Sequence, residues 1–140
     1  MKVLFMCTAN SCRSQMAETW ARHLFPSGWD VFSGGLLTYP ITPATKAAMA
    51  EAGLDMMGQD SKTIDTFNLD SFDLVVTLSK SAGLYLPALS HPDRHVKRPI
   101  ADPMSAKGND AERAEAFREG RERVRDIVAQ VVAGDIAPGS

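Results

Sequence analysis

Residues 7 to 14, Cys-Thr-Ala-Asn-Ser-Cys-Arg-Ser, constrain this chain more than any other stretch. They follow the apolar run Val3–Met6, which is short and uncharged and is therefore typical of a buried strand in a parallel sheet. They precede apolar residues that recur at helical spacing, namely Met16, Ala17, Trp20, Ala21 and Leu24. The octet is therefore predicted to form a turn from a strand into a helix.

Such a turn is a natural binding site for an oxyanion. At such a turn, several backbone N–H groups and the positive end of a helix dipole converge on one point. The same field favours the thiolate form of a cysteine, and Cys7 is the first residue to enter it. We therefore expect Cys7 to be a thiolate nucleophile. The residues expected to surround the oxyanion are Thr8, Ala9, Asn10, Ser11, Cys12, Arg13 and Ser14.

Two side chains at the end of the turn fit this interpretation. The planar guanidinium of Arg13 can hold two oxygens of a tetrahedral oxyanion, and the Ser14 hydroxyl can donate to the Cys7 sulfur. A Cys-x5-Arg spacing followed by a hydroxyl is the sulfur counterpart of a phosphate loop. The alternative is a buried, inert Cys7 and a surface Arg13 whose spacing is accidental.

The motif from Cys7 to Glu18 resembles the low-molecular-weight protein tyrosine phosphatase superfamily, and more closely its arsenate reductase branch. Arsenate reductases carry Cys-Thr-Gly-Asn-Ser-Cys-Arg-Ser-Gln-Met-Ala-Glu, and this chain differs by having Ala9 in place of the glycine. If that position needs a positive φ, alanine costs about 1–2 kcal/mol of strain. The resemblance continues through residues 29–35, 73–78 and 101–103.

The resemblance implies roles for Asp102, Glu18 and Ser33, and side-chain chemistry implies one for Asn10. Asp102, which precedes Pro103, matches the aspartate that protonates the leaving oxygen, a step that needs an acid within hydrogen-bond reach. The alternative is an ordinary Asx turn before proline. Asn10 is expected to hold the loop through its side chain and to tolerate the left-handed region. Glu18 and Ser33 lie where the family places residues that brace the loop.

The chain lacks a hallmark of each subclass. Thioredoxin-coupled arsenate reductases use two further cysteines, and this chain has Ser79 and Leu86 at the matching places. Phosphatases usually follow the Asp-Pro pair with two tyrosines, and here Met104 and Ser105 follow it, although Tyr39 could supply an aromatic wall.

Cys12 has two interpretations. Its side chain packs beneath the loop, or it forms a disulfide with Cys7 under oxidation, as related phosphatases do. Either is compatible with the spacing of the two cysteines.

Three functions follow. The first is an arsenate reductase that attacks with Cys7 and is recycled by an external thiol such as glutathione or mycothiol, with glutaredoxin, mycoredoxin or thioredoxin as partner. The second is a low-molecular-weight phosphatase that acts on phosphotyrosine or an aryl phosphate through a phosphocysteine. The third is an oxyanion-binding redox sensor that signals through a disulfide between Cys7 and Cys12. None of the three needs a bound cofactor or a metal.

Length and charge limit the number of domains, the cellular location and the classes of partner that we expect. The 140 residues are enough for one domain that buries about two thirds of its unfolded surface. No stretch approaches the roughly 20 apolar residues of a membrane span, and Met1 leads directly into a strand, so we expect a cytoplasmic protein. A net charge of -2 gives no reason to expect a nucleic acid or a membrane as partner.

The pattern predicts a single α/β domain over residues 1–134 with a frayed tail over residues 135–140. Short apolar runs alternate with helical segments, which favours four parallel strands in the order 2-1-3-4 with helices on both faces and the phosphate-binding loop after the first strand. The expected strands are 3–6, 29–35, 74–78 and 94–98. The expected helices are 16–24, 43–52 and 109–132, with a brief helix after Ser79 and one turn at 65–69.

Two local signals support these boundaries. Thr42 and Pro43 begin one helix, and Asn109 with Glu112 forms a capping box at the start of the last. Met56 and Met57 are expected to fill the core.

Overall fold

The strands form one parallel sheet. The computed structural model describes residues 1–140 and contains β1 (Lys2–Cys7), β2 (Asp30–Gly35), β3 (Leu74–Thr77) and β4 (His95–Lys97). All neighbouring pairs are parallel, and the order is β2-β1-β3-β4. The predicted α/β class and strand order are therefore confirmed.

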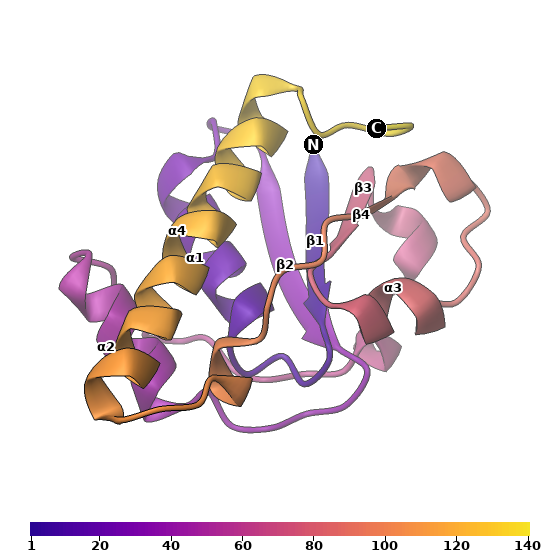
Figure 1. Ribbon diagram of the computed structural model, residues 1–140. Coiled ribbons are helices and arrows are strands. Elements are labelled where there is room, and N and C mark those ends of the chain that lie inside the picture. Colours follow the sequence, from indigo (N-terminus) through magenta and orange to yellow (C-terminus); the bar gives the residue numbers. More distant parts are fainter.

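Helices cover both faces of the sheet. The helices are α1 (Arg13–Leu24), α2 (Pro43–Glu51), α3 (Lys80–Tyr85) and α4 (Asp110–Ala133). In Figure 1, α1, α2 and α4 lie together on one side of the strands, and α3 lies on the other. None of the helices combines the length and the apolar character that crossing a bilayer would require.

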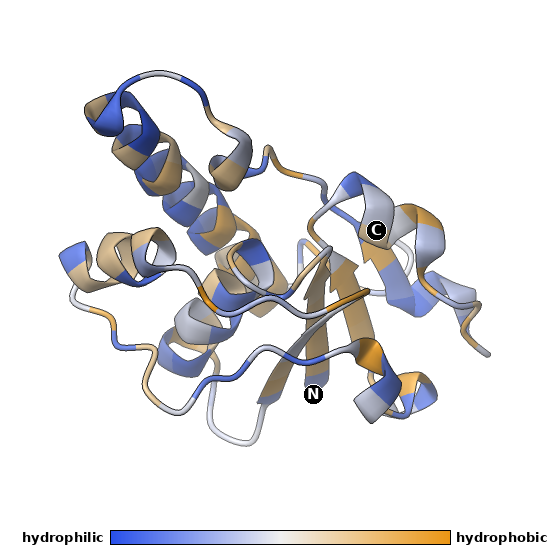
Figure 2. Ribbon diagram, turned by 90° about the horizontal axis from the view of Figure 1, so that it is seen from below, coloured by the Kyte–Doolittle hydropathy of each residue, from blue (hydrophilic) through white to orange (hydrophobic).

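The apolar run of β1 is continuous because both faces of this central strand are buried. Val3 and Phe5 belong to the larger core cluster, under α1 and α4, whereas Leu4 and Met6 belong to the smaller cluster on the opposite face. Side chains alternate between the faces of a strand, so successive residues of the run pack into the two clusters in turn. Figure 2 shows the strands in the hydrophobic colour at the centre of the molecule.

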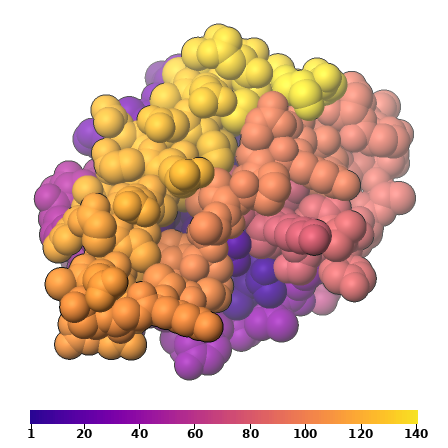
Figure 3. All heavy atoms as spheres, in the orientation of Figure 1, coloured from indigo at the N-terminus to yellow at the C-terminus, as the bar shows by residue number.

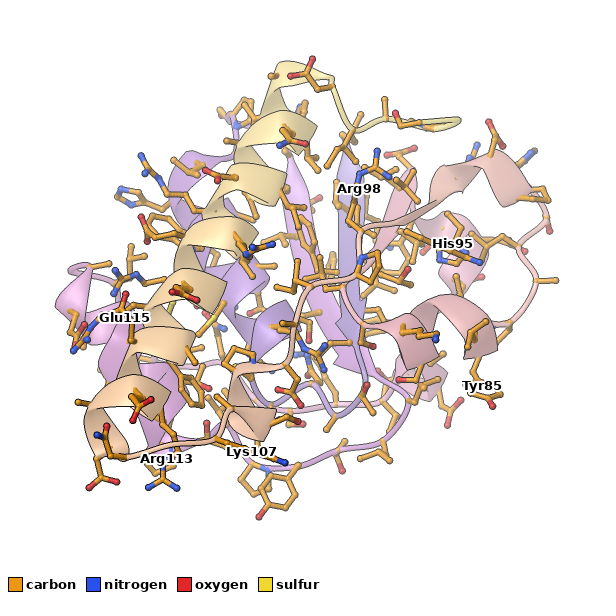
Figure 4. All side chains as sticks on the ribbon, in the orientation of Figure 1. Tyr85, His95, Arg98, Lys107, Arg113 and Glu115 are labelled. Atoms are coloured by element: carbon orange, nitrogen blue, oxygen red, sulfur yellow. The ribbon has the colours of Figure 1, made fainter.

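The last helix follows its predicted pattern. The Asn109 side chain accepts from the N–H of Glu112 at 2.8 Å, and the Glu112 carboxylate accepts from the N–H of Asn109 at 3.3 Å, which is the expected capping box. The predicted apolar face is buried and consists of Phe117, Val124, Ile127, Val128 and Val131. Arg113 and Glu115 point away from the sheet on the outer side of α4 (Figure 4).

Three local expectations need correction. Residues 135–140 are not a frayed tail, because Ile136 is 2% exposed in the main core and the N–H of Gly139 donates to the carbonyl of Asp93. The single turn expected at 65–69 is two short 3-10 turns, Ile64–Thr66 and Leu69–Ser71. Met56 is buried as predicted, whereas Met57 is 81% exposed and fills no core space.

Candidate active site

The loop of residues 8–12 leaves the carboxyl end of β1 and leads into α1. Its carbonyls are held from outside. The N–H of Leu37 donates to the carbonyl of Thr8 at 3.1 Å, and that of Tyr39 donates to the carbonyl of Ala9 at the same distance. The N–H of Thr42 donates to the carbonyl of Ser11 at 3.4 Å. The segment that follows β2 therefore supports the loop along its outer side.

Three N–H groups of the loop point away from the segment that follows β2. In a trans peptide the N–H lies opposite the preceding carbonyl, and the chain contains no cis peptide bond. The N–H groups of residues 8–12 donate to no other backbone group. Because the carbonyls of Thr8, Ala9 and Ser11 are bonded to the segment after β2, the N–H groups of Ala9, Asn10 and Cys12 point away from that segment and are left for an oxyanion.

Asn10 is the loop residue with unusual backbone geometry. Its φ of 49° lies in the left-handed region, and it is the only residue other than glycine in the chain with a positive φ. Ala9 has no positive φ, so the strain that alanine would cost at such a position does not arise. Asparagine is one of the few residues that adopt this geometry readily.

Gly35, at the end of β2, lets the loop approach. A Cβ atom on Gly35 would lie 2.6 Å from the Leu37 carbonyl oxygen and 2.8 Å from the Asn10 nitrogen. Both are backbone atoms that cannot rotate away. The absence of a side chain at this position therefore allows β2, the loop and the following segment to approach one another closely.

Replacing Gly35 by alanine should consequently destabilise the protein and the loop together. We expect the free energy of unfolding to fall by about 1–3 kcal/mol, as for other overpacked sites, and the affinity for phosphate to fall with it. Gly83→Ala is the control, because its Cβ would lie 3.4 Å from the flexible Lys97 side chain and from the Thr77 hydroxyl, which are tolerable distances. Denaturant unfolding and phosphate titration measure both effects. Unchanged phosphate affinity in Gly35→Ala would mean that the loop does not depend on this approach.

Cys7 is 3% exposed, and its sulfur lies 2.8 Å from the Ser14 Oγ. This is the contact that the sequence predicted for Ser14. Burial raises the pKa of the second thiol, Cys12, to about 12, with smaller opposing effects from the Thr45 hydrogen bond and from Arg13. Cys12 is therefore protonated at neutral pH, and a protonated thiol is a poor nucleophile.

Arg13 and Asp102 meet across the loop. Arg13 Nη1 donates to the Ile100 carbonyl at 3.0 Å, and Nη2 lies 3.8 Å from Asp102 Oδ2. Asp102 also accepts from the N–H of Met104 at 3.0 Å and from the Ser105 hydroxyl at 3.3 Å. Asp102 thus begins an Asx turn and also lines the cavity beside Arg13, and its role as a general acid stays a prediction.

A cavity of about 270 Å³ opens above these groups. Its lining residues are Cys7, Thr8, Ala9, Ser11, Cys12, Arg13, Leu37, Tyr39, Asp102 and Met104. Figure 3 shows indigo atoms of the first residues at the bottom of a hollow between the later segments. Tyr39 forms part of the wall, whereas Tyr85 points away from the body of the protein at the end of α3 (Figure 4).

Glu18 and Ser33 lie together beneath the site. The Ser33 hydroxyl donates to Glu18 Oε1 at 2.6 Å, and both side chains are buried. Neither forms a hydrogen bond to the loop itself. Their link to it runs through Lys62, whose Nζ lies 3.8 Å from Glu18 Oε1 and whose N–H donates to Asn10 Oδ1 at 2.9 Å.

Sequence reasoning missed several residues that hold the loop. The Ser61 hydroxyl donates to the Ala9 carbonyl at 3.0 Å, and the Thr8 hydroxyl contacts Ser81 Oγ at 2.7 Å and Ser79 Oγ at 3.1 Å. Contacts between segments that lie far apart in the chain leave no pattern in a sequence. Gln15 offers a signal, because it is a polar residue placed among the buried positions of a helix. No group of three or more His, Cys, Asp or Glu side chains is placed to hold a metal ion.

Comparisons with known proteins identify the family. The family model for the low molecular weight phosphotyrosine protein phosphatases matches residues 2–134. An arsenate reductase of Halalkalibacterium halodurans is 41% identical over 128 residues, which cover 91% of this chain and 89% of that protein. An arsenate reductase of Bacillus subtilis is 40% identical over 129 residues, covering 90% and 88%.

A solved structure of an arsenate reductase has the same fold. It is described as an arsenate reductase in the phosphate binding state, and it superimposes with a TM-score of 0.81 at 34% identity, covering 95% of this chain and 97% of its own. The resemblance seen in the motif from Cys7 to Glu18 is therefore confirmed over nearly the whole chain. The chain belongs to the low molecular weight phosphotyrosine protein phosphatase family of enzymes.

Proposed function

We propose that this protein is an arsenate reductase that attacks arsenate with Cys7 and is recycled by an external thiol. The observation that carries the proposal is the position of the Cys7 thiol at the bottom of a cavity lined by Arg13 and the loop. The names and the identity of the curated relatives, 40% and 41% over most of both chains, support arsenate as the oxyanion.

The first step joins sulfur to arsenic. The Cys7 thiolate attacks the arsenic of arsenate, an S–As bond forms, and an As–O bond breaks. The inward N–H groups of the loop and the Arg13 guanidinium hold the remaining oxygens. Asp102 gives its proton to the departing oxygen, which leaves as water. Arsenic is still in its +5 state at this point.

The second step transfers the electrons. A thiolate attacks the Cys7 sulfur, an S–S bond forms, and the S–As electron pair passes to arsenic, which leaves as arsenite in the +3 state. A second thiol or a redoxin then reduces the mixed disulfide and restores Cys7. Two external thiols are thus oxidised to a disulfide for each arsenate reduced, and glutathione, mycothiol, glutaredoxin, mycoredoxin and thioredoxin are the donors to test.

An internal thiol is poorly placed for this second step. Cys12 is buried, and its pKa of about 12 keeps it protonated. The same property disfavours a disulfide between Cys7 and Cys12 as a redox signal. Ser79 and Leu86 stand where thioredoxin-coupled relatives have cysteines, which leaves the external route.

Replacing Cys12 by serine should therefore preserve arsenite release when an external thiol is present. Without added thiol, a single turnover should release no arsenite in either form of the protein. Mass spectrometry of the intact protein should detect a mixed disulfide on Cys7 when the thiol is limiting. Release of one arsenite per enzyme without added thiol, together with a disulfide between Cys7 and Cys12, would assign the resolving role to Cys12.

A second function, hydrolysis of aryl phosphates through a phosphocysteine, has one observation in its favour. Leu37, Tyr39 and Met104 form an apolar wall around the cavity, and arsenate has no apolar part that could use it. An aromatic leaving group would bury such a surface favourably.

One parallel assay separates the two functions. The purified protein is given arsenate with each thiol donor, and p-nitrophenyl phosphate in a matched sample. Thiol-dependent arsenite release that greatly exceeds phosphate hydrolysis supports the reductase. Hydrolysis with no arsenite from any donor rejects it and supports the phosphatase.

A further inference from the structure

Cys7 lies at one end of a chain of buried hydrogen bonds. Gln59 Nε2 donates to Gln15 Oε1 at 2.8 Å, and Gln15 Nε2 donates to Asn10 Oδ1 at 2.8 Å. Asn10 Nδ2 donates to Ser14 Oγ at 2.8 Å, which lies 2.8 Å from the Cys7 sulfur. Asn10, Ser14 and Gln15 are fully buried, and Gln59 is 7% exposed. We call this series the amide chain.

The orientation of Asn10 is fixed by the backbone. The N–H of Lys62 donates to Asn10 Oδ1 at 2.9 Å, and a backbone N–H is only a donor. The oxygen of the Asn10 amide must therefore face Lys62, and its nitrogen must face Ser14.

The orientation of Gln15 is fixed in the same way. Its Nε2 lies 3.2 Å from the Asn10 carbonyl and 3.1 Å from the Asp60 carbonyl, and carbonyls only accept. Gln15 Oε1 therefore faces Gln59, which must present its nitrogen. Gln59 Oε1 in turn accepts from the Thr19 hydroxyl at 2.9 Å. Every amide in the series thus donates toward Cys7.

This direction bears on what Ser14 does. Asn10 occupies one of the two acceptor sites of its oxygen, and the Cys7 sulfur is the one remaining partner for its single hydrogen, which donates to the sulfur once Cys7 is a thiolate. A hydroxyl that donates to sulfur favours the thiolate over the thiol, because the charged form accepts the stronger hydrogen bond. We propose that Gln15 and Gln59 are positioning residues that, together with the Lys62 N–H, hold Asn10 so that it donates to Ser14 and Ser14 donates to Cys7.

Burial strengthens the effect of the amide chain on the Ser14 hydroxyl. In a medium of low dielectric, a donor whose own acceptor site is occupied becomes more polarised, by about 10–30% per bond. Gln59 comes from the segment after α2 and is 44 residues from Gln15 in the chain. That segment therefore contributes to the reactivity of the nucleophile without touching the cavity in which Cys7 lies. The inference rests on the proposed function only in taking Cys7 as the nucleophile.

The test is the pH dependence of Cys7 alkylation by iodoacetamide, with tandem mass spectrometry to distinguish Cys7 from Cys12. In Gln59→Met the pH midpoint should move upward by roughly 0.2 to 0.6 units, while the plateau rate at high pH stays constant. Gln15→Met should do the same where it folds. Thr77→Val is the control, because it removes a buried hydroxyl that bonds His95 and has no hydrogen bond to the amide chain. Its midpoint should match that of the parent protein.

Coupling to Ser14 makes the test specific. In a Ser14→Ala background, Gln59→Met should cause no further shift, since its effect passes through that hydroxyl. An equal shift in both backgrounds would overturn the inference and indicate an effect through the loop backbone, and no shift in either would also overturn it. A missing reductase activity with the shift intact would reject the proposed function alone. A Cys7 that reacts only as an ordinary free thiol in the parent protein would reject both.

Discussion

Replacing Cys7 by serine should abolish arsenate reduction and any hydrolysis of aryl phosphate, with a loss on the order of 10⁴-fold or more. A hydroxyl is almost wholly protonated at neutral pH, so it cannot begin the first step. The loop should persist, because its carbonyls are bonded to the N–H groups of Leu37, Tyr39 and Thr42 and not to the sulfur.

The measurements for this variant are turnover, denaturant unfolding and sulfate titration. We expect unfolding to change little and sulfate to bind, because the donors of the loop remain. If Cys7→Ser retains turnover with both substrates, the assignment of the whole site is wrong. If it loses sulfate binding as well, the loop depends on the thiol for its shape, and the loss of activity would not identify a nucleophile.

Asp102→Asn should slow the expulsion of the leaving oxygen by about 10²–10⁴-fold, the usual contribution of a general acid. Asparagine keeps the Oδ1 that accepts from the N–H of Met104 at 3.0 Å, so the turn itself should survive. It also removes the carboxyl oxygen that lies 3.8 Å from Arg13 Nη2 and competes with an oxyanion for the guanidinium, so the affinity for an oxyanion should not fall.

The leaving group provides the decisive comparison for this variant. Phenyl phosphate, which needs a proton on its departing oxygen, should lose more rate than p-nitrophenyl phosphate, which does not. Asp55→Asn is a matched control, because Asp55 accepts from the N–H of Met57 at 2.8 Å in the same kind of turn, far from the cavity. Equal rates for Asp102→Asn and Asp55→Asn would leave Asp102 with a structural role alone.

The parts of the fold that could be predicted are those with local causes. The strand of Val3–Met6 is visible because both of its faces are buried, and the start of α4 is visible because Asn109 and Glu112 bond each other within one turn. The turn of Cys7–Ser14 is visible for the same reason, since the chemistry and the backbone geometry lie within eight consecutive residues.

The parts that could not be predicted depend on contacts between distant segments. The burial of Ile136 follows from where α4 ends relative to the sheet, which its own sequence does not state. The support of the loop by Lys62 uses a backbone N–H, which every residue except proline possesses, so no residue type marks it. Met57 was misjudged because a methionine in a connecting segment is apolar whether or not space exists for it.

The way the loop carbonyls are held has a consequence for how such a protein diversifies. Leu37 and Tyr39 hold the loop only through their main-chain N–H groups, while their side chains form the wall of the cavity. Any residue other than proline could occupy these two positions and leave the oxyanion donors in place. The side chains that contact the group attached to an oxyanion can therefore change, while the loop that holds the oxyanion beside Cys7 keeps its shape. One scaffold is in this way able to supply enzymes for a bare inorganic anion and for large esters alike.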